Sequence, residues 1–543
     1  MSSNTNMSSN TNKESFLKGA LILGLAGIIV KIMGAFFRIP LGNIIGSTGL
    51  GYYQAVYPVY TLFLTLATAG FPTALAKLVS EQRAIGDYAG ASKTFRISYT
   101  VLFITGLISF SFFFFGADFI ANVLLKNSGA YAAIIAISPA LLFVPLMSSY
   151  RGYFQGRRDM SKIAISQIVE QFFRVLTGLF IGYMLMKNYG PQMGAAGGVL
   201  GAAAGGFASA VFLIYIYLRS HKERKIEIAH SKHLKPESAG TILKKLLYVA
   251  IPISIGACVM PLVNMVDSVI VVRRLTASGF DIDQANSLLG QLSGMAISTV
   301  NLLVVIDQAI GMSLVPSISE AYALKQMDRV RKEASTGLKT ILLVVLPATF
   351  GFAALAGPIM KLLYPAEPAT LGTMLFVVSP CALFLGLVYT QNGILQGMGK
   401  PMVPVIALAV GMVFKVVLSY TLTAIPSINI IGSGIGTLSA YGVASLIEFI
   451  YIKKHLQLKL SKKEFVVKPL ITVITMYIVV KLSYGLLVGS LGNALSTLVA
   501  ICIGGLVYVL VLLGIGGIKK EEILTLPKGD KIYSILRKLK LVR

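Results

Sequence analysis

The chain contains little charge for its length. Only 13% of its 543 residues are Asp, Glu, Lys or Arg, while 55% are hydrophobic. Roughly a quarter of the residues are charged in an average soluble protein. This balance excludes an ordinary soluble globular domain and predicts an all-α, polytopic membrane protein.

Several residue types are absent or scarce. Tryptophan is absent, so tyrosine and phenylalanine must form any aromatic belt at the membrane interfaces. The three cysteines, Cys258, Cys381 and Cys502, are scattered through apolar runs, which predicts neither a disulfide framework nor a metal site. Acidic residues number 22 against 48 Lys and Arg, and the net charge is +26. Because the basic residues gather in loops between apolar runs, they indicate orientation in a membrane, and we expect no nucleic-acid partner.

Charge-poor runs predict about fourteen transmembrane helices. Basic residues dominate the N-terminus, the even-numbered loops and the C-terminal tail, so the positive-inside rule places both termini in the cytoplasm. The first apolar run is too long for the core of a cleavable signal peptide. The predicted helices cover residues 17–38, 52–79, 95–117, 131–154, 161–186, 193–218, 244–272, 287–312, 336–360, 370–395, 402–424, 431–452, 467–489 and 493–517.

The second half of the chain repeats features of the first. GYFQG at 152–156 matches GILQG at 393–397, 241 positions later, and the same offset pairs Arg174 with Lys415. Ser80-Glu81 matches Ser319-Glu320 at an offset of 239. Two six-helix lobes in parallel orientation, with a central cavity, are therefore expected. The predicted divisions are a disordered N-terminus (1–15), an N-lobe (16–218), a basic linker (219–243), a C-lobe (244–455), two further helices (456–517) and a basic tail (518–543).

Five motifs resemble those of a known family. They are KIMGAFFRIPLGNIIGSTGLGYYQ (31–54), GFPTALAKLVSEQ (70–82), RGYFQGRRDM (151–160), SLVPSISEA (313–321) and NGILQGMGKP (392–401). With them the chain resembles the multidrug/oligosaccharidyl-lipid/polysaccharide exporter superfamily, and within it the polysaccharide-biosynthesis flippases of the stage V sporulation protein B and Gram-positive lipid II flippase branch. The resemblance implies an alternating-access flippase of undecaprenyl-pyrophosphate-linked cell-wall precursors, above all lipid II for peptidoglycan, in the bacterial plasma membrane.

The resemblance is incomplete at charged positions. Lipid II flippases carry two basic positions in the first helix, which match Lys31 and, with a one-residue slip, Arg38. The family's arginine in the second helix falls here in LFLTLATAG, and an acidic-basic pair of the eighth helix falls in QLSGMAISTVN. Identical handling of the substrate is therefore not implied.

The N-lobe charges predict a binding site for an anion. Lys31, Arg38 and Arg174 are cations for phosphate, Gln54 suits sugar hydroxyls, and Glu170 lies one helical turn before Arg174. The alternatives are that the cations snorkel to the headgroups and that Glu170 only neutralises Arg174 for insertion. The neighbouring tyrosines, Tyr52, Tyr53, Tyr57 and Tyr60, also fit an aromatic belt.

The C-lobe charges predict coupling or structural roles. Asn264, Asp267, Asp307, Lys415 and Glu448 all fall within predicted helices. We expect Asp267 to pair with Lys415, so that an ammonium group replaces the sodium ion of some relatives and no metal is bound. Asp307 and Glu448 are either coupling groups or interfacial. No cofactor is predicted; membrane potential is one driver of transport, and a sodium or proton gradient is the other.

Other functions fit less well. The same resemblance allows a teichoic, capsular or other polysaccharide precursor as cargo. A multidrug exporter of the same superfamily handles cations, which the basic first helix disfavours. An enzyme would need a large external loop or an acidic catalytic pair, so none is expected, and a non-transporting scaffold would not need intramembrane charges. The expected partners are the lipid-linked oligosaccharide substrate, membrane lipids and cell-wall synthesis proteins.

Overall fold

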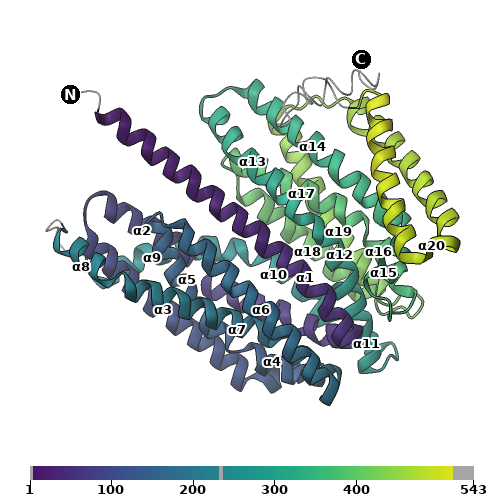
Figure 1. Cartoon of the computed structure of the whole chain (residues 1–543), viewed down its shortest axis with the longest axis horizontal. Helices are drawn as coiled ribbons and strands as arrows, with labels where there is room; N and C mark the ends of the chain where they lie inside the picture. Colours follow the sequence, from purple (N-terminus) through teal and green to yellow (C-terminus); the bar gives the residue numbers. More distant parts are fainter. Residues whose placement is uncertain (1–3, 232–236, 518–543) are drawn as a thin grey trace. The chain divides into compact units, whose positions relative to one another are not determined.

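Helices joined by short turns form the whole described structure (Figure 1). This computed structural model describes residues 4–231 and 237–517, and within those ranges it contains no strand. The chain divides into two compact units, residues 1–290 (unit 1) and 291–543 (unit 2), which we describe separately. Helix α1 begins at Asn4, inside the predicted disordered segment, and the predicted basic tail at 518–543 lies outside the described residues.

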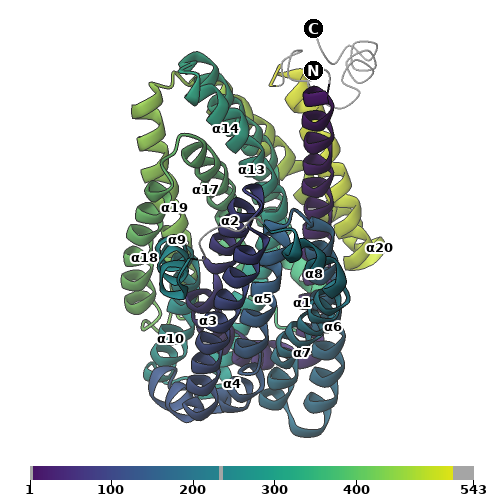
Figure 2. The same ribbon diagram turned by 90° about the vertical axis from the view of Figure 1, so that its left-hand side faces the viewer.

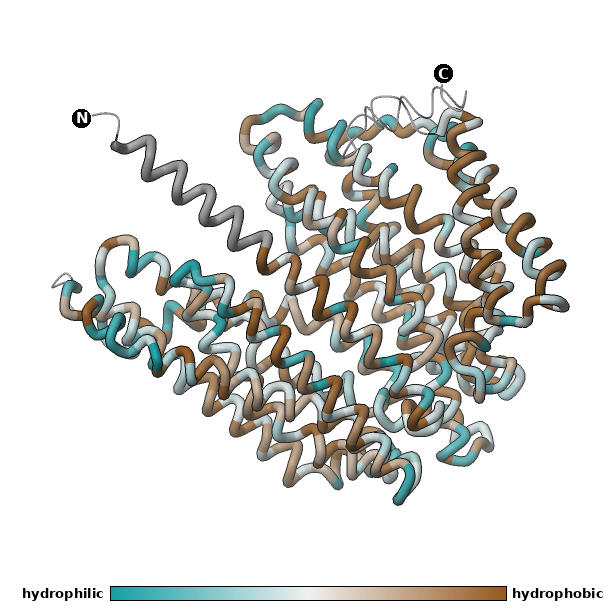
Figure 3. The backbone as a smooth tube through the Cα atoms, viewed as in Figure 1, coloured by the Kyte–Doolittle hydropathy of each residue, from teal (hydrophilic) through white to brown (hydrophobic). Residues whose placement is uncertain are grey.

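The described helices confirm a polytopic all-α membrane protein. Twelve helical segments of the described part are long and apolar enough to cross a membrane. Two of them, Ile22–Ala84 and Lys463–Gly514, contain a glycine with positive φ, Gly46 (66°) and Gly492 (69°), where the chain bends between two helices. Dividing both there gives fourteen spans. Apolar residues dominate the middle of the helices and polar residues their ends (Figure 3).

Unit 1 is held together by close helix packing at glycine. A Cβ atom at Gly205 would lie 2.4 Å from the carbonyl oxygen of Glu170, and one at Gly201 would lie 2.4 Å from that of Arg174. Only glycine permits this approach of α7 to α6, which lie side by side in Figure 2. The elements are α1 (Asn4–Thr68), α2 (Phe71–Ala84), α3 (Tyr88–Phe115), η1 (Phe119–Leu124), η2 (Ser128–Ala130), α4 (Tyr131–Ile137), α5 (Ala140–Gly156), α6 (Met160–Tyr189), α7 (Pro191–Arg219), α8 (His221–Ala229), α9 (Ala239–Ala257), α10 (Val259–Ala277) and α11 (Ile282–Leu289).

The predicted helix at 244–272 is interrupted in the structure. Helix α9 ends at Ala257 and α10 begins at Val259. Pro261 has no N–H group to donate to the carbonyl of Ala257, so the helical hydrogen-bond ladder breaks there. Both helices, and α11 after them, belong to unit 1: Gly70 N donates to Ser254 Oγ (3.0 Å), and Ser47 and Ser287 share a hydrogen bond (2.8 Å).

Unit 2 has a core of aliphatic side chains from α13, α14, α17 and α19, centred on the fully buried Ile318, Ile394 and Ile452. The elements are η3 (Gly290–Ala296), which crosses the boundary between units, α12 (Ile297–Val300), η4 (Asn301–Leu303), α13 (Val304–Ala323), α14 (Met327–Ala354), α15 (Ala356–Leu363), α16 (Thr370–Val378), α17 (Pro380–Gly397), α18 (Met402–Leu422), α19 (Ile431–Leu456), η5 (Lys463–Val467) and α20 (Lys468–Gly514).

The predicted repeat appears in the structure as two pairs of identical turns. After α5 the N–H groups of Arg157 and Arg158 donate to the carbonyls of Tyr153 and Gln155, and after α17, 241 residues later, those of Met398 and Gly399 donate to Ile394 and Gln396. The turn after α2, with Gly86, matches the turn after α13, with Lys325, at an offset of 239. All four turns have positive φ at the corresponding residue: 63° at Arg158, 71° at Gly399, 82° at Gly86 and 58° at Lys325.

A carboxylate fastens part of the linker to unit 1. Glu227 of α8 accepts two hydrogen bonds from Arg83 (3.0 and 3.1 Å) and two from Arg157 (2.6 and 3.1 Å). These arginines lie at the C-terminal ends of α2 and α5. The Glu227 side chain therefore links the ends of both helices to α8. Burial alone would raise the pKa of Glu227, but the hydrogen bonds and charges of the two arginines outweigh it and lower the pKa to about 2.

Replacing Glu227 by Gln removes the charge that both arginines share. We expect this variant to destabilise unit 1 by about 1–2 kcal/mol, since the cluster is partly exposed to solvent. The melting temperature of the purified protein in detergent measures the loss. Glu223→Gln is the matched control, because Glu223 is an exposed carboxylate on the same helix; equal melting temperatures of the two variants would contradict the role of Glu227.

The same cluster predicts a pH dependence. The pKa of Glu227 falls from its ordinary 4.5 to about 2 on folding, so its stabilisation is complete above about pH 4.5 and is lost as the pH falls towards 2. The difference in melting temperature between the parent and Glu227→Gln should therefore shrink over this window. A difference that stays constant down to pH 2 would show that the carboxylate charge contributes nothing.

Candidate functional site

A three-residue ion cluster lies inside unit 1. Glu170 Oε1 accepts from Arg174 Nη2 at 2.8 Å, and Glu170 Oε2 accepts from Arg151 Nη2 at 3.0 Å. The exposed fractions of the side chains are 15% for Glu170, 17% for Arg151 and 21% for Arg174. The predicted pair of Glu170 and Arg174 is present, and a second arginine gives the cluster a net positive charge.

Three helices position the cluster. Arg151 lies in the last turns of α5, and Glu170 and Arg174 lie one turn apart on α6. Arg151 also donates to the hydroxyls of Ser166 on α6 (2.9 Å) and Ser209 on α7 (3.3 Å). Arg151 is therefore held by three acceptors, whereas Arg174 has one side-chain acceptor and a buried Nε atom with no hydrogen-bond partner among the described residues.

Tyrosines of α1 stand beside the cluster. The rings of Tyr53 and Tyr57 stack with centroids 5.3 Å apart, and Tyr57 lies 5.7 Å from Tyr60. Arg174 interacts electrostatically with all three tyrosines. Tyr60 is 1% exposed, and its hydroxyl has no hydrogen-bond partner among the described residues. A buried hydroxyl and a buried guanidinium N–H without partners leave donors for an anion at this place.

The other predicted N-lobe residues lie on α1. Arg38 is half-buried and interacts electrostatically with Tyr53, which Arg174 also approaches. The side chain of Gln54 is half-buried, and its carbonyl accepts from Ser268 of α10 at 2.9 Å. Lys31 is exposed on α1. The structure thus brings Arg38, Glu170 and Arg174 to one tyrosine cluster, and the binding roles of all five residues stay predictions.

The predicted C-lobe charges lie in both units. Asp267 (buried) and Asn264 (exposed) belong to α10 of unit 1, and Lys415 (1% exposed) belongs to α18 of unit 2. The pair of Asp267 and Lys415 stays a prediction.

Two carboxyl groups of unit 2 are almost completely buried. Asp307 is 1% exposed and Glu448 is 0% exposed. Within the described part of the chain neither oxygen of Asp307 has a hydrogen-bond partner, and Gln391, with its amide turned to donate, lies 3.2 Å from Glu448 Oε2. A coupling role for them stays a prediction. No group of three or more metal-ligating side chains occurs within residues 4–231 and 237–517.

The sequence did not point to Arg151 as part of the site. It precedes Arg157 and Arg158 closely in the sequence. It therefore resembles a third basic residue of a cytoplasmic loop that sets the orientation in the membrane. Its position inside α5, about one and a half turns before the end of that helix, was the available signal, because a cation inside a helical span needs a partner.

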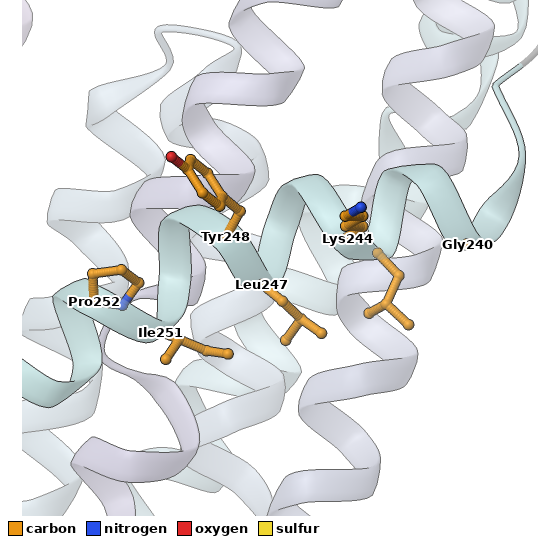
Figure 4. A pocket seen from close by; sticks show the side chains of 7 residues that line it. Gly240, Lys244, Leu247, Tyr248, Ile251 and Pro252 are labelled. Carbon is orange, nitrogen blue, oxygen red and sulfur yellow. The ribbon is translucent and has the colours of Figure 1, made fainter.

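A hollow on α9 does not add to the site. Gly240, Lys244, Leu247, Tyr248, Ile251 and Pro252 line it along one helix (Figure 4). Tyr248 is 83% exposed, and the lining comes from α9 alone. It is therefore the face of a helix, without groups that converge on a ligand.

Comparison with known families and proteins identifies the chain's relatives. The family model described as polysaccharide biosynthesis protein matches residues 16–322, more than half of the chain. The chain belongs to this family. The MatE model matches residues 291–421, so both halves carry features of the multidrug/oligosaccharidyl-lipid/polysaccharide exporter superfamily.

Named relatives cover nearly the whole chain. It is 29% identical over 518 residues to the lipid II flippase MurJ of Bacillus subtilis, covering 91% of this chain and 94% of that protein. It is 26% identical to stage V sporulation protein B of the same organism, covering 95% and 98%. A solved structure of lipid II flippase MurJ in an inward closed conformation matches with a TM-score of 0.66 at 16% identity, covering 90% of this chain and 98% of that one. The chain thus has a flippase-type fold, and those of its relatives that are named for an activity are transporters, not enzymes.

A double-mutant cycle tests the ion cluster. We expect Arg151→Gln and Glu170→Gln each to destabilise the protein, because each leaves a partly buried charge with fewer partners, and the double variant to lose less than the sum. Groups in one ion-pair network couple by about 0.5–3 kcal/mol. Unfolding of the full chain in detergent measures the coupling, and Arg219→Gln, at an exposed arginine of α7, controls for loss of positive charge. Additive losses would show that the contact contributes no coupling energy.

Proposed function

We propose that this protein translocates an undecaprenyl-pyrophosphate-linked cell-wall precursor, lipid II for peptidoglycan, across the bacterial plasma membrane by alternating access, with both termini in the cytoplasm. The name of one relative, the lipid II flippase MurJ, supports a lipid-linked cargo. The single observation that carries the proposal is the cationic cluster inside unit 1, where Arg174 and Tyr60 have donors without partners.

The cluster suits a pyrophosphate because one cation is free to change partners. Arg151 remains bound to Glu170, Ser166 and Ser209 when Arg174 turns to a phosphate oxygen. Glu170 is then never left as an uncompensated buried carboxylate, which would cost several kcal/mol. In this proposal Arg174 binds the phosphate, Glu170 holds Arg174 in the absence of cargo, and Arg151 positions Glu170.

The residues of α1 complete the recognition. Arg38 adds a second cation beside Tyr53, and the tyrosine rings offer flat apolar faces and hydroxyls to sugars. Lys31 lies before the bend of α1 at Gly46 and Gln54 lies after it, and in this proposal both add polar groups to the binding surface. Another lipid-linked polysaccharide precursor carries the same pyrophosphate, and the match to the polysaccharide biosynthesis family keeps it as the second candidate.

Complementation tests both the cargo and the cluster. In a bacterium depleted of its lipid II flippase, we expect the parent chain to restore growth and Arg174→Gln to lower plating efficiency at least tenfold. Arg38→Ala should weaken rescue as well, while Arg219→Gln, an exposed arginine of α7, should rescue like the parent. Immunoblots of membranes establish equal amounts of each protein.

The outcomes separate the two parts of the proposal. Failure of the parent at normal membrane levels would exclude lipid II as the cargo in that host. Rescue by Arg174→Gln would retain the cargo and exclude Arg174 as the phosphate ligand.

A further inference from the structure

A cavity of about 460 Å³ is lined by residues of unit 2 alone. Helices α14, α17 and α19 and the segment 460–466 enclose it, and apolar side chains such as Leu342, Phe384, Leu446 and Phe449 form its walls. Figure 2 shows the three helices near one another. This volume falls in the range of pockets that hold small ligands, about 300–1,000 Å³.

The charged groups of the cavity lie at one end, and the two polar residues of its body, Gln391 and Ser445, carry no charge. Lys453, Ser461 and Lys462 line one end, where α19 finishes and η5 begins, and all three are exposed. From Lys453 the lining continues along α19 to Gly442, about 16 Å at the rise of an α-helix. The cavity is therefore cationic at the end of a membrane-spanning helix, and its walls along the body of that helix are uncharged and mostly apolar.

The fold does not require a cavity here. At the offsets of the internal repeat, Leu338 and Gln391 of the lining correspond to Tyr99 and Tyr150 of unit 1. Those two rings pack edge to face with centroids 5.9 Å apart, in a cluster with Phe95 and Tyr217. Unit 1 fills this place with aromatic side chains, whereas unit 2 leaves it open.

The lysines alone have a simpler explanation. A cation in the last turn of a helix is favoured by the helix dipole, and lysines at the ends of spans extend to headgroups. That explanation accounts for Lys453 and Lys462, but it does not account for an apolar cavity that begins beside them.

We propose that this cavity binds an anionic phospholipid of the surrounding bilayer, with its phosphate between Lys453 and Lys462 and one acyl chain along α19. The two lysines are complementary in charge to the phosphate of this lipid. The apolar walls beside them are complementary to its acyl chain. Ser461 donates a further hydrogen bond to the headgroup. Because the lining joins α14, α17 and α19 to η5, the lipid fastens the start of α20 to the bundle. The proposal is independent of the transported cargo.

The absence of tryptophan provides the experiment. Phe449→Trp places a single indole in the cavity wall, and Leu486→Trp places one on α20 at a position that is 81% exposed. The full chain is reconstituted in phosphatidylcholine vesicles that contain either brominated phosphatidylglycerol or brominated phosphatidylcholine. We expect the indole at 449 to be quenched by phosphatidylglycerol with a preference on the order of tenfold, since two lysines face one phosphate, and the indole at 486 to show no comparable preference.

Matched variants distinguish binding of phosphatidylglycerol in the cavity from a general attraction of anionic lipids to a basic protein. Lys453→Gln/Lys462→Gln should abolish the preference at 449, while Lys454→Gln/Lys459→Gln, which removes the same charge outside the lining, should retain it. Gly442→Leu should fill the cavity and lower quenching by both lipids, and a Cβ at this glycine meets the Phe384 ring at an ordinary 3.7 Å.

Three results would overturn the proposal. They are equal quenching at 449 by the two lipids, loss of the preference in the control lysine pair, and displacement of phosphatidylglycerol by a much smaller amount of undecaprenyl phosphate. The last would assign the cavity to a polyprenyl phosphate. Circular dichroism of each variant establishes that the helices are retained.

Discussion

The carboxylate of Glu170 binds two guanidinium groups inside a bundle of apolar helices. The close packing of the surrounding backbone makes this arrangement possible. Charge in such a place is stable only beside its counter-charge. The glycines of α7 let that helix approach α6 at the carbonyls of Glu170 and Arg174. This approach places Ser209 against Arg151 and completes its set of acceptors. Close packing and charge compensation in unit 1 therefore depend on the same residues.

The helices and the repeat could be predicted from the sequence because both leave signals in consecutive residues. Long apolar runs, basic loops and the GYFQG and GILQG segments are visible without any knowledge of tertiary contacts. The link between Glu170 and Arg174 was predictable for the same reason, since residues four apart share a helix face. The interruption at Cys258 was missed, although Pro261 gave a local signal for it.

The rest depends on contacts between distant segments, which no local pattern contains. Arg151 reaches Glu170 across 19 positions, and Glu227 meets Arg83 across 144. Helices α9 to α11 pack into unit 1 although they follow the linker, through contacts such as that of Ser254 with Gly70. The cavity of unit 2 was also beyond sequence reasoning, since a void is a property of side chains that do not meet.

The matching turns at the ends of the repeated helices also bear on the history of the chain. Each pair joins a glycine to a basic residue at the same left-handed position: Arg158 with Gly399, and Gly86 with Lys325. A residue with a Cβ atom is less stable than glycine in that conformation by about 1–2 kcal/mol. The glycine belongs to the first half of the chain in the pair Gly86 and Lys325, and to the second half in the pair Arg158 and Gly399. Backbone strain at these turns is therefore divided between the two halves. A duplicated segment that kept its backbone path while its side chains diverged independently in each copy leaves this record.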